Sequence, residues 1–299
     1  MRIAAIDLGS NTFHLIIAEK KKESIEILYK INKPIKLSEN ITKNNAIIPA
    51  AYNRGINCLA EFKKIIESYS VEKVKAVATS AVRSAINGEE FINSVRLDTG
   101  IEIQIISGDE EALYIFEGIK ASGAILEKSL IMDIGGGSVE FIFCDEKKAY
   151  WKKSFDIGAA RLMQNFWHSD PLNLTDHNAI IRHLDETLLD VLEYNNSFGV
   201  MNLIGSAGAF ETYYEILNIH NTVENIDSAD LILKDYIALS HKLIQSTHAD
   251  REKIPNLIPL RVDMIVMACI ITNYIIEKMN IKKLKMSTYD LKYGLLDTL

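Results

Sequence analysis

The chain has 299 residues, of which 48% are hydrophobic and 24% charged, and its net charge is −7. The length predicts two domains, and an acidic chain argues against binding nucleic acid through a broad basic surface. The three cysteines are far apart and lack the spacing of metal ligands, which argues against a zinc site or a disulfide framework: Cys58, Cys144 and Cys269. No signal-peptide pattern opens the chain, and the apolar stretch 264–271 is too short to cross a bilayer. We therefore expect a cytoplasmic protein without a membrane segment.

The first part of the chain predicts a sheet interleaved with helices. Pro49 is typical of a helix start, and apolar residues follow it at helical spacing. Ser107 and Gly108 open another helix directly after an apolar strand. The predicted elements are strands at 2–8, 12–19 and from 25–29 onward, a helix from 49 to about 69, a strand at 73–78, a helix at 88–97, a strand at 101–106 and a helix from 107.

The same order of elements restarts after Gly123, which predicts an internal repeat with domains at 1–123 and 124–299. Thr175 is a plausible N-cap for a long helix that reaches about Tyr194. We also expect the last helix to pack back on the first domain. The other predicted elements are strands at 130–133, 139–144, 150–155, 201–204 and 283–287, a buried core helix at 264–271 and a short C-terminal helix. Ligands of duplicated α/β domains commonly lie in the cleft between them.

Two segments, 6–17 and 132–143, align with each other without a gap. In each, an apolar strand leads to Asp-x-Gly, a turn of small residues follows, and a second apolar strand leaves. A carboxylate at a strand end can hold a hydrated Mg²⁺ ion, and glycine-rich turns present backbone N–H groups to anions. The residues concerned are Asp7, Gly9, Ser10 and Asn11 in the first copy, and Asp133, Gly135, Gly136, Gly137 and Ser138 in the second. One copy alone would be an ordinary hairpin, but two facing copies indicate a clamp for a phosphate chain and its metal ion.

Further acidic residues lie near these hairpins. Glu140 follows Ser138 by two positions and therefore points to the same face of its strand, where a metal ligand and an exposed strand residue are about equally plausible. Glu110 and Glu111 occupy the first turn of a predicted helix, where acidic residues are common because they complement the helix dipole. A carboxylate there could also orient a water molecule for attack on a phosphoryl group, although composition alone favours the ordinary explanation.

Other motifs carry a weaker signal. Arg83 and Arg161 are each either a phosphate ligand or a surface arginine. The turn 205–208 lies between a strand and a helix and could bind a phosphate, but it is short. His14, on an apolar strand, is expected to be a packed residue. No Gly-x-Ser-x-Gly elbow, Walker-type phosphate loop or His-Glu-x-x-His motif is present.

Taken in order, these motifs resemble the exopolyphosphatase / guanosine pentaphosphate phosphohydrolase (Ppx/GppA) family, in a short two-domain form. The resemblance covers nearly the whole chain. It is carried by Asp7–His14, Ala78–Arg83, Ile106–Ala112, Asp133–Ser138 and Gly158–Leu162.

The resemblance implies an α/β fold of the actin-like ATPase (sugar kinase/Hsp70) superfamily, with two ribonuclease-H-like domains flanking a cleft. It implies release of terminal orthophosphate from inorganic polyphosphate or from pppGpp, with Mg²⁺ or Mn²⁺ as cofactor. Glu111 matches the catalytic glutamate and Arg83 the phosphate-binding arginine. The metal positions are matched by Asp7, Asp133 and Glu140, and the phosphate loops by Gly9, Ser10, Asn11, Gly135, Gly136, Gly137, Ser138, Gly205, Ser206 and Gly208. No nucleic-acid or membrane partner is implied, and the resemblance leaves open whether the protein forms a homodimer.

Two departures from the family pattern affect nucleotide binding and phosphate geometry more than catalysis. Ala207 and Ala209 replace residues of the usual Gly-x-Ser-Gly-Thr turn, and Lys292 replaces an arginine of the usual Leu-Arg-Glu-Gly motif. The chain also ends where long members continue into a helical domain. Two other functions stay open: a small-molecule kinase of the same superfamily, and a non-catalytic sensor of polyphosphate or guanosine alarmones.

Overall fold

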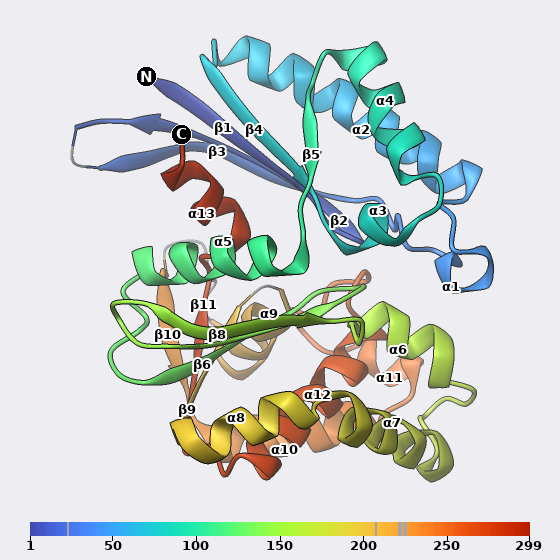
Figure 1. The fold of residues 1–299 in the computed structure, drawn as a ribbon. Helices are drawn as coiled ribbons and strands as arrows, with labels where there is room; N and C mark the ends of the chain where they lie inside the picture. Colours follow the sequence, from blue (N-terminus) through green and yellow to red (C-terminus); the bar gives the residue numbers. More distant parts are fainter. Residues whose placement is uncertain (23, 207, 221–222, 224–225) are drawn as a thin grey trace.

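The structure is a computed structural model that describes residues 1–22, 24–206, 208–220, 223 and 226–299. Two mixed sheets form the framework of the molecule (Figure 1). The first sheet has the strand order β3-β2-β1-β4-β5. Its strands are β1 (Arg2–Leu8), β2 (Thr12–Lys20), β3 (Ile25–Pro34), β4 (Lys73–Ala78) and β5 (Ile103–Ile105).

The second sheet repeats this arrangement and adds a strand at its far edge. Its order is β10-β11-β9-β6-β7-β8. Its strands are β6 (Ser129–Ile134), β7 (Val139–Cys144), β8 (Ala149–Phe155), β9 (Asn202–Ser206), β10 (Ser228–Leu231) and β11 (Lys283–Ser287). In both sheets an antiparallel hairpin, β1–β2 or β6–β7, lies beside a parallel strand, β4 or β9. The predicted α/β fold of two similar halves is confirmed.

Helices cover the outer faces of both sheets and also fill the space between them (Figure 1). The helices of the first half are α1 (Ile41–Asn44), α2 (Pro49–Ser68), α3 (Ser80–Ser84), α4 (Gly88–Thr99) and α5 (Gly108–Ala121). Those of the second half are α6 (Ala159–Phe166), α7 (Leu174–Thr187), α8 (Leu189–Phe198), α9 (Gly208–Leu217), α10 (Leu233–Gln245), α11 (His248–Arg251), α12 (Met264–Lys278) and α13 (Leu291–Asp297).

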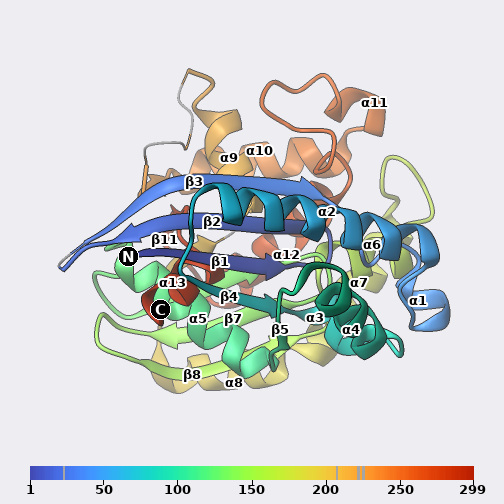
Figure 2. The same cartoon turned by 90° about the horizontal axis from the view of Figure 1, so that it is seen from above.

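The last helix, α13, returns to the first half of the chain and packs against α5 and β1. Viewed from above, it lies beside α5 beneath the first sheet, close to both termini (Figure 2). The crossing with α5 is tight, since a Cβ on Gly294 would lie 1.9 Å from the carbonyl oxygen of Tyr114. A shared apolar cluster joins the two halves here and includes Ile3 of β1, Ile142 of β7 and Leu295 of α13. The boundary at residue 123 stays a prediction.

The structure differs from the sequence expectation in the segment 174–198. The helix expected to run from Thr175 to about Tyr194 is two helices, interrupted at Leu188. Its N-cap is Asn173, whose side chain accepts a hydrogen bond from the backbone N–H of Asp176, and not Thr175. The core helix at 264–271 is α12, which extends to Lys278, and among the described residues no helix is long and apolar enough to span a membrane.

Candidate functional site

A cleft of about 190 Å³ lies where the turns of the β1–β2 and β6–β7 hairpins meet. Both hairpin turns contribute to its wall, and α5, α9, α12 and the start of α13 complete it. Most of the predicted site residues line it: Asp7, Gly9, Ser10, Asn11, Glu111, Asp133, Gly135, Gly136, Gly137, Ser138, Glu140 and Gly208.

The two hairpin turns have the same internal hydrogen bond. The N–H of Gly9 donates to the carbonyl of Thr12 at 3.1 Å, and the N–H of Gly135 donates to the carbonyl of Ser138 at 3.0 Å. The turns also touch each other across the cleft, because a Cβ on Gly136 would lie only 2.4 Å from Nδ2 of Asn11. A larger side chain at Gly136 would have to displace the side chain of Asn11 from this contact.

Three carboxyl groups face the cleft: those of Asp133 and Glu140 are buried, and that of Asp7 is half-buried. Burial, reinforced by the neighbouring carboxylates, raises the pKa of each of them to about 8. Asp133 and Glu140 are opposite one another in the β6–β7 register, and Oε1 of Glu140 accepts a hydrogen bond of 2.6 Å from the hydroxyl of Ser154. The ionised carboxylates are therefore unfavourable in this cleft, and a bound cation would stabilise them.

The acidic pair at the start of α5 separates into two roles. Glu110 completes a capping box with Ser107, in which its side chain accepts from the backbone N–H of Ser107. Glu111 is only 7% exposed and lies in the cleft wall, where its Oε2 accepts a hydrogen bond of 2.9 Å from Nη1 of Arg83. Burial raises the pKa of Glu111 to about 7 even though Arg83 lowers it. Such a carboxyl group is suited to accept a proton near neutral pH.

The carboxylates are suited to a divalent cation that keeps most of its water ligands, and less suited to one coordinated by protein side chains alone. Among the described residues, no group of three His, Cys, Asp or Glu side chains is placed to hold a metal ion. Mg²⁺, however, usually keeps several water ligands and binds one or two carboxylates together with substrate phosphates. Oδ1 of Asp7 is buried and has no hydrogen-bond partner among the residues that the structure describes, so this oxygen is available for a cation or its water.

Some predicted residues lie behind the cleft wall. A Cβ on Gly205 would lie 2.0 Å from the ring of Phe210, so this glycine permits close packing. Ser206 is fully buried and its hydroxyl hydrogen-bonds Asp133, which lowers the pKa of that carboxyl group. Nε of Arg161 donates to the carbonyl of Gly137 at 3.0 Å, so this arginine supports the second hairpin turn. Ala207 lies outside the described residues.

The cleft is also lined by four charged residues that the sequence motifs did not identify as site residues: Glu211, Arg261, Asp290 and Lys292. Lys292 was noted only as a departure from a family motif. Although burial favours its neutral amine, Asp290 and Glu211 hold the pKa of Lys292 above its ordinary value. Arg261 donates to Oγ1 of Thr212 at 2.6 Å. Arg261 and Lys292 thus place two cations beside the carboxylates, an arrangement that suits a cleft that receives a polyanion.

His14 also reaches the cleft, although an ordinary packed residue was expected there. Its Nδ1 lies 2.7 Å from Oδ1 of Asn32. Burial, assisted by the nearby Lys292, lowers the pKa of His14 to about 4. The imidazole is therefore neutral near pH 7 and contributes hydrogen bonding without charge.

These observations define a duplicated α/β protein with a glycine-lined, carboxylate-rich cleft between its two hairpins. The chain belongs to the Ppx/GppA phosphatase family, whose model matches residues 16–299.

Solved structures and curated relatives agree with this family. The chain is similar to the crystal structure of an exopolyphosphatase from Cytophaga hutchinsonii, with 33% identity, a TM-score of 0.96 and coverage of 100% of this chain and 97% of that one. It is also similar to an Aquifex aeolicus PPX-GPPA enzyme, with 25% identity, a TM-score of 0.84 and coverage of 100% and 99%. A Vibrio vulnificus guanosine-5'-triphosphate,3'-diphosphate pyrophosphatase is 31% identical over 76% of this chain. The matched part is 46% of that protein. An Aliivibrio fischeri relative of the same name is 28% identical over 99% of this chain, and the matched part is 59% of its length. The chain therefore spans about half of the length of these two relatives.

Proposed function

We propose that this protein is an exopolyphosphatase-type hydrolase that releases terminal orthophosphate from inorganic polyphosphate, from pppGpp or from both, by attack of water. The observation that carries the proposal is the pair of Glu111 and Arg83 beside the two glycine turns. Transfer of a phosphoryl group to water requires mainly positioning and charge stabilisation. Glu111, a base with a pKa near neutral, and a set of backbone donors line this one cleft, and Arg83 contacts Glu111.

In this mechanism, Glu111 orients the attacking water and accepts its proton. Arg83 holds Glu111 in place through the 2.9 Å hydrogen bond and has further donors with which to bind phosphoryl oxygens. Backbone N–H groups at 10–11 and 136–138 receive the terminal phosphate. Asp7 and Asp133 would hold Mg²⁺ or Mn²⁺, which supplies positive charge for the phosphate oxygens.

Two relatives support two different substrates. The solved Cytophaga hutchinsonii relative is named an exopolyphosphatase, whereas the Vibrio vulnificus relative is named for a guanosine nucleotide. Both substrates end in a phosphoanhydride, and the cleft residues described above address that terminal group. We therefore propose the reaction class for this chain and leave the preference between the two substrates to measurement.

The test compares phosphate release from polyphosphate and from pppGpp, as kcat/KM, for the wild type and Glu111→Gln. The matched control is Glu110→Gln, which changes the adjacent carboxylate on α5 and keeps a side chain that can complete the capping box. We expect Glu111→Gln to lower kcat by roughly 10²–10⁴-fold, the usual contribution of a general base, and Glu110→Gln to keep wild-type kcat. Equal turnover by both variants would refute the role of Glu111. Tight binding of either substrate with no turnover by the wild type would instead favour a sensor.

A further inference from the structure

The segment 252–263, between α11 and α12, has no regular secondary structure, yet it places a positively charged side chain in the cleft wall. Leu260 and Arg261 from this segment line the cleft, as does Met264 at the start of α12. Its backbone hydrogen bonds are local: some close turns, such as that from the N–H of Arg261 to the carbonyl of Ile258 at 2.9 Å, and others join the first turn of α12, such as that from the N–H of Ile265 to the carbonyl of Arg261 at 2.9 Å. Local turns alone fix a loop weakly, so other contacts must hold Arg261 in position.

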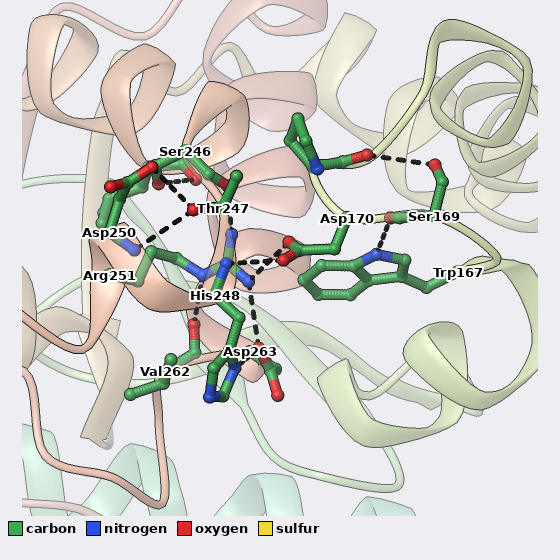
Figure 3. A network of polar contacts seen from close by, with 12 residues as sticks. Trp167, Ser169, Asp170, Ser246, Thr247, His248, Asp250, Arg251, Val262 and Asp263 are labelled. Atoms are coloured by element: carbon green, nitrogen blue, oxygen red, sulfur yellow. Dashed lines mark hydrogen bonds and ion pairs between the residues drawn. The ribbon is translucent and has the colours of Figure 1, made fainter.

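Arg251 supplies those contacts from inside the domain (Figure 3). Its side chain is fully buried. Its Nε donates to the carbonyl of Val262 at 2.7 Å, and its Nη2 donates to Oδ1 of Asp263 at 3.0 Å. The two residues that follow Arg261 are therefore both bound by this one guanidinium group.

The same guanidinium is fixed from two other parts of the fold. Nη1 donates to the carbonyl of Ser246 at the end of α10, and Nη2 reaches Oδ1 of Asp170 at 3.3 Å. Its plane lies over the ring of Trp167, with 5.1 Å between Cζ and the ring centroid. The planar fork of arginine can meet all of these acceptors at once, and lysine cannot. Arg251 thus connects the loop after α6, the end of α10 and the segment that precedes α12.

The head of Arg261 is fixed separately, on α9. It donates to Oγ1 of Thr212 at 2.6 Å and lies 3.5 Å from Oε2 of Glu211. A Cβ on Gly208 would lie 2.1 Å from Nη2 of Arg261, so the guanidinium covers this glycine closely. The position of Arg261 therefore depends on contacts at both ends, with Arg251 holding the backbone end.

We infer that Arg251 is a positioning residue for substrate binding, which acts through Arg261 and does not itself line the cleft. The inference rests on the proposed function, because it assigns the cleft to a phosphate chain. Loss of the guanidinium would leave Asp263 with its contact to His248 Nδ1 at 2.7 Å, but would loosen residues 262–263 and displace Arg261 from the cleft wall. Since small displacements of positioned groups can cost up to roughly 100-fold, we expect Arg251→Met to raise KM by 10- to 100-fold on this basis, with little change in kcat. Arg251→Lys should restore part of the affinity.

The decisive experiment is a cycle of Arg251→Met, Arg261→Met and the double variant, with KM and kcat measured on the substrate that the wild type hydrolyses. If Arg251 acts through Arg261, the double variant has the KM of Arg261→Met alone. A folded Arg251→Met protein with wild-type KM, or multiplicative effects in the double variant, would overturn the inference. The matched control is Tyr274→Phe, which removes a 3.0 Å hydrogen bond to Asp185 farther along α12 and should leave KM unchanged.

Two additions keep the test decisive. If Arg251→Met does not fold, Asp170→Asn weakens the same network and should also raise KM. An unchanged KM in Asp170→Asn would contradict the inference.

Binding of inorganic tripolyphosphate is also measured calorimetrically in a Glu111→Gln background, in which the ligand is not turned over. Absence of hydrolysis by the wild type would refute the proposed function, whereas loss of tripolyphosphate binding on adding Arg251→Met would still support the positioning role. Unchanged binding would refute that role.

Discussion

Nη1 of Arg83 donates a 2.9 Å hydrogen bond to Oε2 of Glu111, and the same nitrogen donates to the carbonyl of Ile106 at 3.0 Å. The carbonyl contact anchors the arginine to the end of β5, so Glu111 meets a cation whose position is already fixed. The pKa of Glu111 nevertheless reaches about 7, because burial outweighs the attraction of Arg83. The charge of this carboxyl group therefore changes within the range in which enzymes are assayed.

The first prediction concerns the pH dependence of activity. A general base must be ionised to work, so kcat/KM should rise with pH and level off above about 7, the pKa of Glu111. Arg83→Met removes the cation that favours the ionised form and should move the midpoint to higher pH. Initial rates across a pH series measure this, with the exposed Arg96→Met on α4 as a control that keeps the wild-type midpoint. An unchanged midpoint in Arg83→Met would contradict the assignment.

The second prediction concerns the stability of metal-free protein. The pKa of Asp7 is raised from 3.8 to about 8 in the folded state. Its protonated form therefore favours folding: the contribution is fully present below the unfolded pKa and is lost as pH rises through about 8. Asp7→Asn cannot ionise and should be more stable than the wild type at pH 8, with a difference that narrows as pH falls towards 4.

Urea unfolding in the presence of a chelator measures this difference at several pH values. Mg²⁺ added at high pH should stabilise the wild type more than Asp7→Asn, because a ligand that binds only the folded state stabilises it. If both proteins respond equally to Mg²⁺, Asp7 is not part of the cation site. Asp133→Asn offers an independent repeat, since burial also raises the pKa of Asp133 to about 8.

The third prediction concerns the contact between the two hairpin turns. A Cβ on Gly137 would lie 2.6 Å from Oγ of Ser80 and 2.7 Å from Oγ of Ser10. Gly137→Ala must therefore displace the side chains of Ser80 and Ser10, and we expect a loss of stability of about 1–3 kcal/mol, typical of overpacking, together with a larger loss of kcat/KM. The control is Gly123→Ala, at a φ of 69° with no atom near its Cβ, which should lose stability without losing kcat/KM. Wild-type kcat/KM in Gly137→Ala would show that the turns need not meet.

The hairpins could be predicted from sequence because their information is local. Asp-x-Gly between two apolar strands specifies a strand end and a turn, and both turns close with the same hydrogen bond. It was harder to predict from sequence that Glu110 caps α5 whereas Glu111 lines the cleft. It depends on which side of α5 faces the second sheet, and that is decided by packing between distant segments.

Other features had no local signal at all. Leu184, Leu188 and Val191 are all buried and keep helical spacing across the interruption at Leu188, so apolar periodicity could not reveal it. The strand β10 is only four residues long and pairs with β11 across more than fifty positions of sequence. Arg261 reaches the cleft from an irregular segment whose course is set by the buried Arg251, a relationship visible only in three dimensions.

The position of α13 has a consequence for how the chain folds as it is made. Leu291 and Leu295 cover apolar residues of β1, such as Ile3 and Ala5, yet they are synthesised almost three hundred residues later than that strand. Domains commonly fold in order as they leave the ribosome. Here the inner face of the first sheet cannot obtain its final cover until the second sheet has also been translated. The first sheet therefore completes its packing only after α13 has been translated.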